Sequence, residues 1–253
     1  DRAIDPWGAL NLHTLWLMTI LIAAVSFAGY AAVKIAGPER GLLLAAAFGG
    51  LFASTAVTLS LARLARHNGA HTRLLAGGIL AAGTVMLARV LVVTGLINFA
   101  LAEVLAIPLL AGMAGMALVT LAYVMSDRDR QAKAAKGFML KNPFDFGEVL
   151  KFGALLAVVT VAVVLVRQQW GDTGLLTLAA LSGLADVDAI TLSVARLGTV
   201  ETVAVEAILM TALVNTLAKN AYAFIAGGTR LGWQVLAGTA VSAAVALAAW
   251  HFV

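Results

Sequence analysis

Two aspartates interrupt an otherwise apolar stretch of this chain. Asp186 and Asp188 lie within residues 174–197, where Arg196 is the other charged residue. The length and composition of this run predict a membrane-spanning helix, and Asp186 would lie about 18 Å from one end, near the middle of the bilayer. A carboxylate at that depth costs at least about 2.5 kcal/mol, so we expect it to be paired, protonated or facing water.

A regular helix would direct these two carboxylates about 200° apart, because they are two residues apart. They can face one ligand only if the helix breaks, and a break at Ser182-Gly183, just before them, would let them converge. Discontinuous helices of this kind form ion sites in transporters. We therefore predict a cation or proton site, with Asp186 and Asp188 as the metal ligands. The alternative is that both aspartates are structural partners in salt bridges.

Neutral oxygens would complete such a site, because hard cations bind carboxylates together with neutral oxygens. Hydroxyl groups commonly form hydrogen bonds between membrane helices, which is the alternative explanation for those found here. The hydroxyl residues that we expect to take part in ion binding are Ser54, Thr55, Thr58 and Thr191, with Ser193 nearby. Three further polar residues are candidate charge partners of the aspartates or anion contacts, unless the longer ones snorkel to the interface: Arg89, Asn215 and Lys219.

Eight apolar runs of helical length make up most of the chain. They span residues 15–33, 41–62, 74–97, 104–125, 152–166, 174–197, 203–225 and 231–253. The chain is 62% hydrophobic and 12% charged, whereas soluble domains carry about 25% charged residues. Runs this long are not barrel strands. We expect an all-α integral membrane protein of about eight transmembrane helices, with the lipid bilayer as its main partner.

The second and sixth runs indicate an internal duplication. Residues 41–64 and 174–197 are identical at 14 of 24 positions without a gap. Their alignment pairs Ala53 with Asp186 and Thr55 with Asp188. We predict two four-helix repeats, at residues 1–126 and 148–253, joined by a cytoplasmic linker at 127–147. Four spans in each half would relate the halves by an axis along the membrane normal, whereas a re-entrant hairpin would make the number odd and the repeat inverted.

The basic residues predict the orientation, because cytoplasmic loops collect Lys and Arg. Eight spans with a cytoplasmic N-terminus place nine flanking Lys and Arg inside and four outside, so we expect both termini in the cytoplasm. The net charge of +4 has the same explanation. We do not expect nucleic-acid binding, because the sequence has no basic face interleaved with aromatic residues. The chain has no cysteine, which excludes disulfides and thiolate metal sites.

Several segments resemble a known family. They are GPERGLLL and STAVTLSLARLAR within residues 37–66, NPF at 142–144, SGLADVDAITLSVARL at 182–197 and NTLAK at 215–219. They are similar to the bacterial membrane domain of unknown function number 4010, over almost the whole chain. The resemblance implies an inner-membrane protein and an association with MgtC/SapB-type domains, a group linked with magnesium limitation.

These patterns favour a transporter or channel for a small ion, expected to be a cation, with proton coupling plausible. The site would lie between the two repeats, and a bound cation is the cofactor that this function implies. The alternative is a regulatory or scaffold membrane protein that binds another membrane complex. Residues 112–116, Gly-Met-Ala-Gly-Met, would then pack within or between subunits, for example in a homo-oligomer. We do not expect an enzyme, because no nucleophile is paired with a base.

Overall fold

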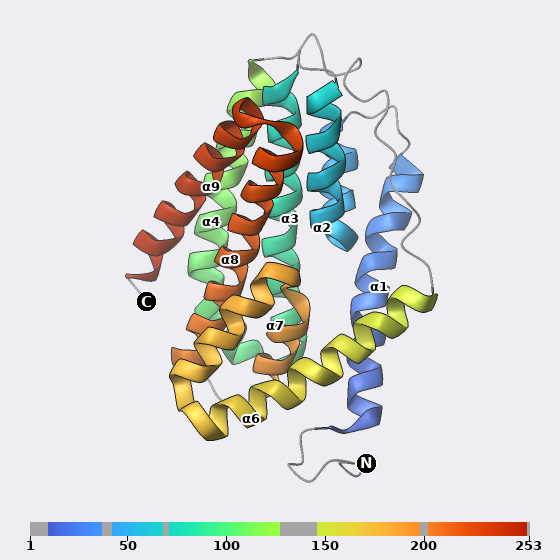
Figure 1. The fold of residues 1–253 in the computed structure, drawn as a ribbon, viewed down its shortest axis with the longest axis vertical. Coiled ribbons are helices and arrows are strands. Elements are labelled where there is room, and N and C mark those ends of the chain that lie inside the picture. The colour runs from blue at the N-terminus through green and yellow to red at the C-terminus, as the bar shows by residue number, and fades with distance from the viewer. Residues whose placement is uncertain (1–9, 37–41, 68–70, 127–145, 198–201, 252–253) are drawn as a thin grey trace. The chain divides into compact units, whose positions relative to one another are not determined.

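The computed structural model describes residues 10–36, 42–67, 71–126, 146–197 and 202–251. Every regular element in these ranges is an α-helix (Figure 1). The helices are α1 (Leu12–Ala36), α2 (Leu42–His67), α3 (Thr72–Ile97), α4 (Phe99–Met125), α6 (Phe146–Ala185), α7 (Asp188–Ala195), α8 (Thr202–Gly227) and α9 (Thr229–Trp250). The predicted all-α class is therefore confirmed.

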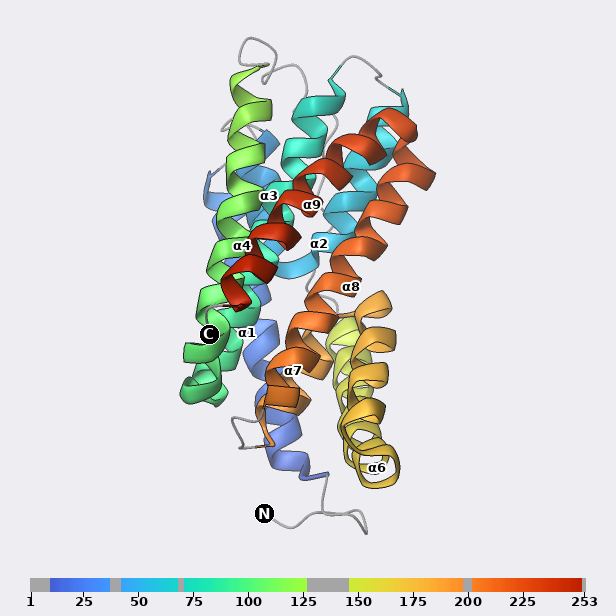
Figure 2. The ribbon, with the colours of Figure 1, turned by 90° about the vertical axis from the view of Figure 1, so that its left-hand side faces the viewer.

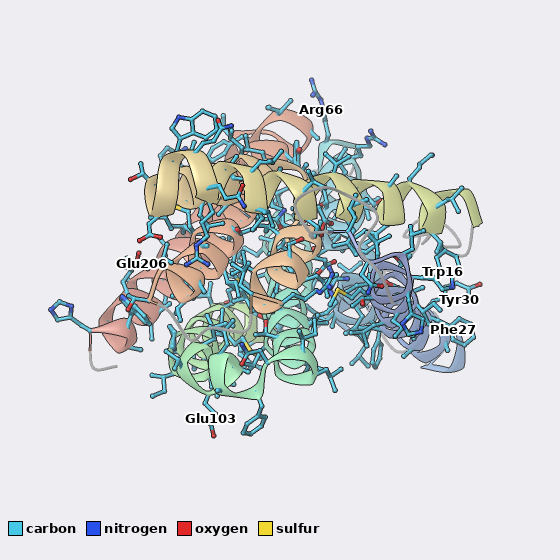
Figure 3. The ribbon with its side chains drawn as sticks, turned by 90° about the horizontal axis from the view of Figure 1, so that it is seen from below. Trp16, Phe27, Tyr30, Arg66, Glu103 and Glu206 are labelled. Atoms are coloured by element: carbon cyan, nitrogen blue, oxygen red, sulfur yellow. The ribbon has the colours of Figure 1, made fainter. Side chains whose placement is uncertain are left out.

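Five of the described helices are long and apolar enough to cross a membrane. They are α3, α4, α6 from Val149 onward, α8 and α9. Large apolar side chains on these helices are exposed, such as Phe99 and Ile225, which are 71% and 74% exposed. Trp16, Phe27 and Tyr30 likewise project outward from α1 (Figure 3). Such surfaces suit lipid rather than water, so the chain is a multi-pass membrane protein.

Residue contacts divide the chain into two compact units. Unit 1 consists of Asp1–Ala24, Val90–Ala106 and Phe144–Asn215, and unit 2 consists of Val25–Arg89, Ile107–Pro143 and Thr216–Val253. Helices α1, α3, α4 and α8 contribute residues to both units. The units therefore do not coincide with the two sequence repeats, and each unit is described by itself.

Helix α2, in unit 2, is broken at Ala53 and folds back on itself. Ala53 has φ −155° and ψ 66°, outside the helical region. Leu42, Ala46 and Leu61 all have side-chain atoms within 4.0 Å of the position that a Cβ on Gly78 would take. A continuous helix would hold Leu42 and Leu61 about 28 Å apart. The two arms of α2 therefore lie antiparallel, and α2 is called hairpin 1 below.

A second break lies at the aligned position in unit 1. Helix α6 ends at Ala185 and α7 begins at Asp188. Earlier, α6 turns at Gly171, whose φ of 58° favours glycine. Figure 1 shows the part of α6 after this turn rising to the break, from which α7 returns; α6 and α7 are in contact. Residues 172–195 are called hairpin 2 below.

The two hairpins explain why eight complete spans are not confirmed. The second and sixth predicted spans, 41–62 and 174–197, are the two folded-back segments. The other predicted spans fall within or close to observed helices; the short fifth run, 152–166, lies within α6, which begins at Phe146. Most of the predicted linker, residues 127–145, lies outside the described residues.

Candidate ion site at the broken helices

Asp186 caps the N-terminus of α7. Its Oδ1 accepts hydrogen bonds from the backbone N–H groups of Asp188 and Ala189, at 2.7 and 3.0 Å. The first N–H groups of a helix have no partner within the helix, and a carboxylate both satisfies them and complements the positive end of the helix dipole. Asp186 therefore stabilises the second arm of hairpin 2. This structural role differs from the salt bridge that the sequence suggested as the alternative.

Asp188 is a buried carboxylate. It is 4% exposed, and all eight residues of α7 are buried. One turn later, the Thr191 hydroxyl donates to the Val187 carbonyl oxygen at 2.7 Å. The Ser193 hydroxyl lies 2.8 Å from the Ala189 carbonyl oxygen and 3.0 Å from the Thr160 hydroxyl. A hydroxyl that donates its hydrogen still has lone pairs on its oxygen, so these oxygens retain the capacity to bind a cation.

Asn215 supplies a buried amide beside the same break. Its Nδ2 donates to the Gly183 carbonyl oxygen at 2.9 Å, three residues before Asp186. The residue is 4% exposed, and its Oδ1 is buried with no hydrogen-bond partner. Leaving such an acceptor unpaired costs about 1–3 kcal/mol. An amide oxygen is also a ligand that hard cations accept, so this atom suits a bound ion.

Hairpin 1 repeats this local arrangement within unit 2. Arg89, which is 6% exposed, donates from Nη1 to the Leu51 carbonyl oxygen at 2.6 Å, two residues before the break. Thr58 donates to the Ser54 carbonyl oxygen at 2.9 Å. Ser54 and Thr58 align with Val187 and Thr191, which make the same bond in hairpin 2. In each segment, a polar side chain from the following long helix thus holds a carbonyl next to the break.

A glycine in each hairpin also brings its first arm against that following helix. A Cβ on Gly50 would lie 2.7 Å from the Ala82 Cα, and a Cβ on Gly183 would lie 2.7 Å from the Thr211 carbonyl oxygen. Gly50 and Gly183 are aligned residues. The Thr211 hydroxyl donates in turn to the Ala179 carbonyl oxygen at 3.1 Å. The two aligned segments therefore share three features: the break, the close glycine contact, and the hydroxyl bond made by Thr58 in one and Thr191 in the other.

The predicted site residues fall into both units. Asp186, Asp188, Thr191 and Asn215 belong to unit 1, and Ser54, Thr55, Thr58, Arg89 and Lys219 belong to unit 2. Lys219 is 4% exposed, and its Nζ lies 2.7 Å from the Met86 sulfur. The burial of Arg89 and Lys219 excludes the snorkelling explanation for these two side chains.

Two other acidic residues in the described part of the chain do not join this region. Glu103 and Glu206 are exposed and point away from the helices (Figure 3). Among the described residues, no group of three or more His, Cys, Asp or Glu could hold a metal ion. A cation at hairpin 2 would therefore need hydroxyl, amide or carbonyl oxygens besides the carboxylates. Thr160 and Thr211 were not among the predicted site residues, although a polar residue in an apolar run was the signal that could have identified them.

Comparisons with known proteins identify the family. The family model described as "Domain of unknown function (DUF4010)" matches residues 20–227. The chain is also 30% identical over 194 residues to an uncharacterized protein of Aquifex aeolicus (strain VF5), covering 75% of this chain and 84% of the relative. No solved structure matches. The chain belongs to the family of this domain of unknown function.

Proposed function

We propose that this family member binds a small cation and carries it across the bacterial inner membrane, with Asp188 as the charged ligand. The observation that carries this proposal is the broken helix of unit 1. Buried Asp188 follows the break, and the unpaired amide oxygen of Asn215 lies on the residue that holds the Gly183 carbonyl before it. Broken helices that expose carbonyls are a recurrent ion-binding device in transporters.

We propose separate roles for the two aspartates. The cap made by Asp186 offsets the positive end of α7, which would otherwise repel a cation near the break. Asp188 is then the carboxylate that we assign to the cation, and it lies in a buried setting. Thr191 and Asn215 supply neutral oxygens. This mixture of one charge and several neutral oxygens suits a hard cation. Exchange of a monovalent cation for one proton on Asp188 would leave the charge of the site unchanged.

A scaffold function has less support. It would need an exposed face of small residues for a partner, and residues 112–116 were the candidate. Cβ atoms on Gly112 and Gly115 would lie 3.2 and 3.0 Å from atoms of Ser242, whose hydroxyl donates to the Gly112 carbonyl oxygen at 2.7 Å. The two glycines of this stripe therefore pack against α9 of the same unit. We also propose that the site is shared by the two repeats and that the protein is not an enzyme. An association with MgtC/SapB-type domains and a homo-oligomer are further parts of the proposal.

Flux measurements test the function. The purified protein is reconstituted in liposomes, and uptake of Na⁺, K⁺, Mg²⁺ and H⁺ is measured for the wild type, Asp188→Asn and Asp172→Asn. Asp172 is an exposed aspartate on the same helix as the first arm of hairpin 2, so its substitution is the matched control. We expect one cation to be carried by the wild type and the control, and its uptake to fall at least about tenfold in Asp188→Asn. Equal flux in all three proteins would contradict the proposal.

A further inference from the structure

Several helix ends of unit 2 lie on one side of that unit. Arg66, at the end of hairpin 1, donates to the carbonyl oxygen of Ile225, at the end of α8, at 3.3 Å. Tyr123, near the end of α4, donates to the carbonyl oxygen of Gln234, near the start of α9, at 2.9 Å. In Figure 1 these helix ends lie together, with both ends of α2 and the start of α3.

A third contact includes the start of hairpin 1 in the same group. A Cβ on Gly77, near the start of α3, would lie 3.7 Å from side-chain atoms of both Leu43 and Tyr123. Leu43 is the second residue of α2. One face of unit 2 thus holds six helix ends: the start and end of α2, the start of α3, the end of α4, the end of α8 and the start of α9.

Eight consecutive crossings cannot give this arrangement. They would place the two ends of α2 on opposite faces of the membrane, and would also separate the end of α4 from the start of α9. If hairpin 1 enters and leaves on the same face, all these ends fall on one side. The first half of the chain then crosses with α3, α4 and α1, which we include because its apolar run at 15–33 is of spanning length. The second half crosses with α6 up to Gly171, α8 and α9, while hairpin 2 returns to the face from which it enters.

We propose that the chain is an inverted repeat of three crossings and one re-entrant hairpin, with both of its described ends outside the cytoplasm. An odd number of crossings in each half reverses the second half relative to the membrane. Hairpin 1 then opens to the cytoplasm and hairpin 2 to the opposite side. Eight spans place both ends of the chain in the cytoplasm, whereas this topology places both outside. The inference does not depend on the proposed ion transport.

The basic residues independently support this orientation. With eight spans, thirteen flanking Lys and Arg divide nine inside to four outside. In the inverted repeat, Lys34, Arg40 and Arg230 move inside and Arg196 moves outside, so the same thirteen divide eleven to two; with Arg2, which also moves outside, the division changes from ten to four to eleven to three. Cytoplasmic enrichment of Lys and Arg is the rule that sets membrane topology, and the folded-back arrangement satisfies it better.

Cysteine labelling in intact cells tests the topology, because the chain has no cysteine of its own. Four exposed positions are substituted one at a time: Ser126→Cys, Thr173→Cys, Thr229→Cys and His251→Cys. Ser126 is cytoplasmic and Thr173 external in both arrangements, so they calibrate the impermeant reagent. Thr229 and His251 distinguish the arrangements, because each changes side between them.

We expect the reagent to label His251→Cys and Thr173→Cys from outside, and Thr229→Cys and Ser126→Cys only after the cells are permeabilised. External labelling of Thr229→Cys, or protection of His251→Cys, would overturn the inverted repeat. External labelling of Ser126→Cys would overturn the orientation itself. Because labelling does not require flux, a failure of the transport proposal would leave this result unchanged, and the two failures can be told apart.

Discussion

Asn215 donates a 2.9 Å hydrogen bond to the Gly183 carbonyl oxygen, while its own buried amide oxygen has no partner. The bond fixes the amide beside the break in hairpin 2. Because this oxygen is buried without a hydrogen-bond partner, a bound cation would compensate for its lost contact with water. This relationship joins the local fold of unit 1 to the proposed ion site.

The first prediction concerns this amide. Asn215→Leu removes both the bond to Gly183 and the unpaired oxygen, and we expect cation flux in liposomes to fall at least about tenfold. The matched control is Asn220→Leu, because Asn220 is also 4% exposed, lies on α8 and has a buried Oδ1 without a partner. An equal loss of flux in both variants would show that any buried amide of α8 is needed for folding, and not this one for ion binding.

The second prediction separates the cap from the charge at Asp186. Asp186→Ala removes the acceptor for two backbone N–H groups, and loss of such a cap costs about 1 kcal/mol of stability. Asp186→Asn keeps a side-chain oxygen in place, so we expect most of that stability to remain. Thermal unfolding of both variants in detergent measures the difference. If Asn proves as destabilising as Ala, Asp186 does not act as the cap.

The third prediction concerns the close approach of hairpin 2 to α8. A Cβ on Gly183 would lie 2.7 Å from the Thr211 carbonyl oxygen, so Gly183→Ala must displace backbone. Overpacking of this kind costs about 1–3 kcal/mol, which thermal unfolding in detergent would detect. Gly95→Ala is the control, because its Cβ would meet the Ala102 Cβ at an ordinary 3.6 Å. Equal melting temperatures for the two variants would argue against this packing.

Much of the fold could be predicted from the sequence, because the signals were strong. Long apolar runs predict helices, and the observed α3 at Thr72–Ile97 lies within two residues of the predicted 74–97. The helix does not break at Ser182-Gly183, where a break would have let the aspartates converge, but at Asp186 and Val187. Hydropathy could not reveal that the chain reverses there, because a folded-back helix pair and a straight span have the same composition.

The candidate site was predicted in part for a related reason. A carboxylate in an apolar run stands out, so Asp186 and Asp188 were readily identified. Their separate roles depend on backbone geometry, since Asp186 becomes a cap only when α7 begins at Asp188. Asn215 was identified as a candidate charge partner of the aspartates, but its contact with Gly183 depends on how hairpin 2 packs against α8, which no residue spacing shows.

The most direct test of the central claim is equilibrium binding of the transported cation to the purified protein. We expect saturable binding to the wild type and to the exposed-site control Asp172→Asn. Asp188→Asn, which removes the buried charge while nearly preserving side-chain shape, should weaken binding at least about tenfold. Unchanged affinity in a folded Asp188→Asn protein would show that the carboxylate of Asp188 is structural and that the cation binds elsewhere.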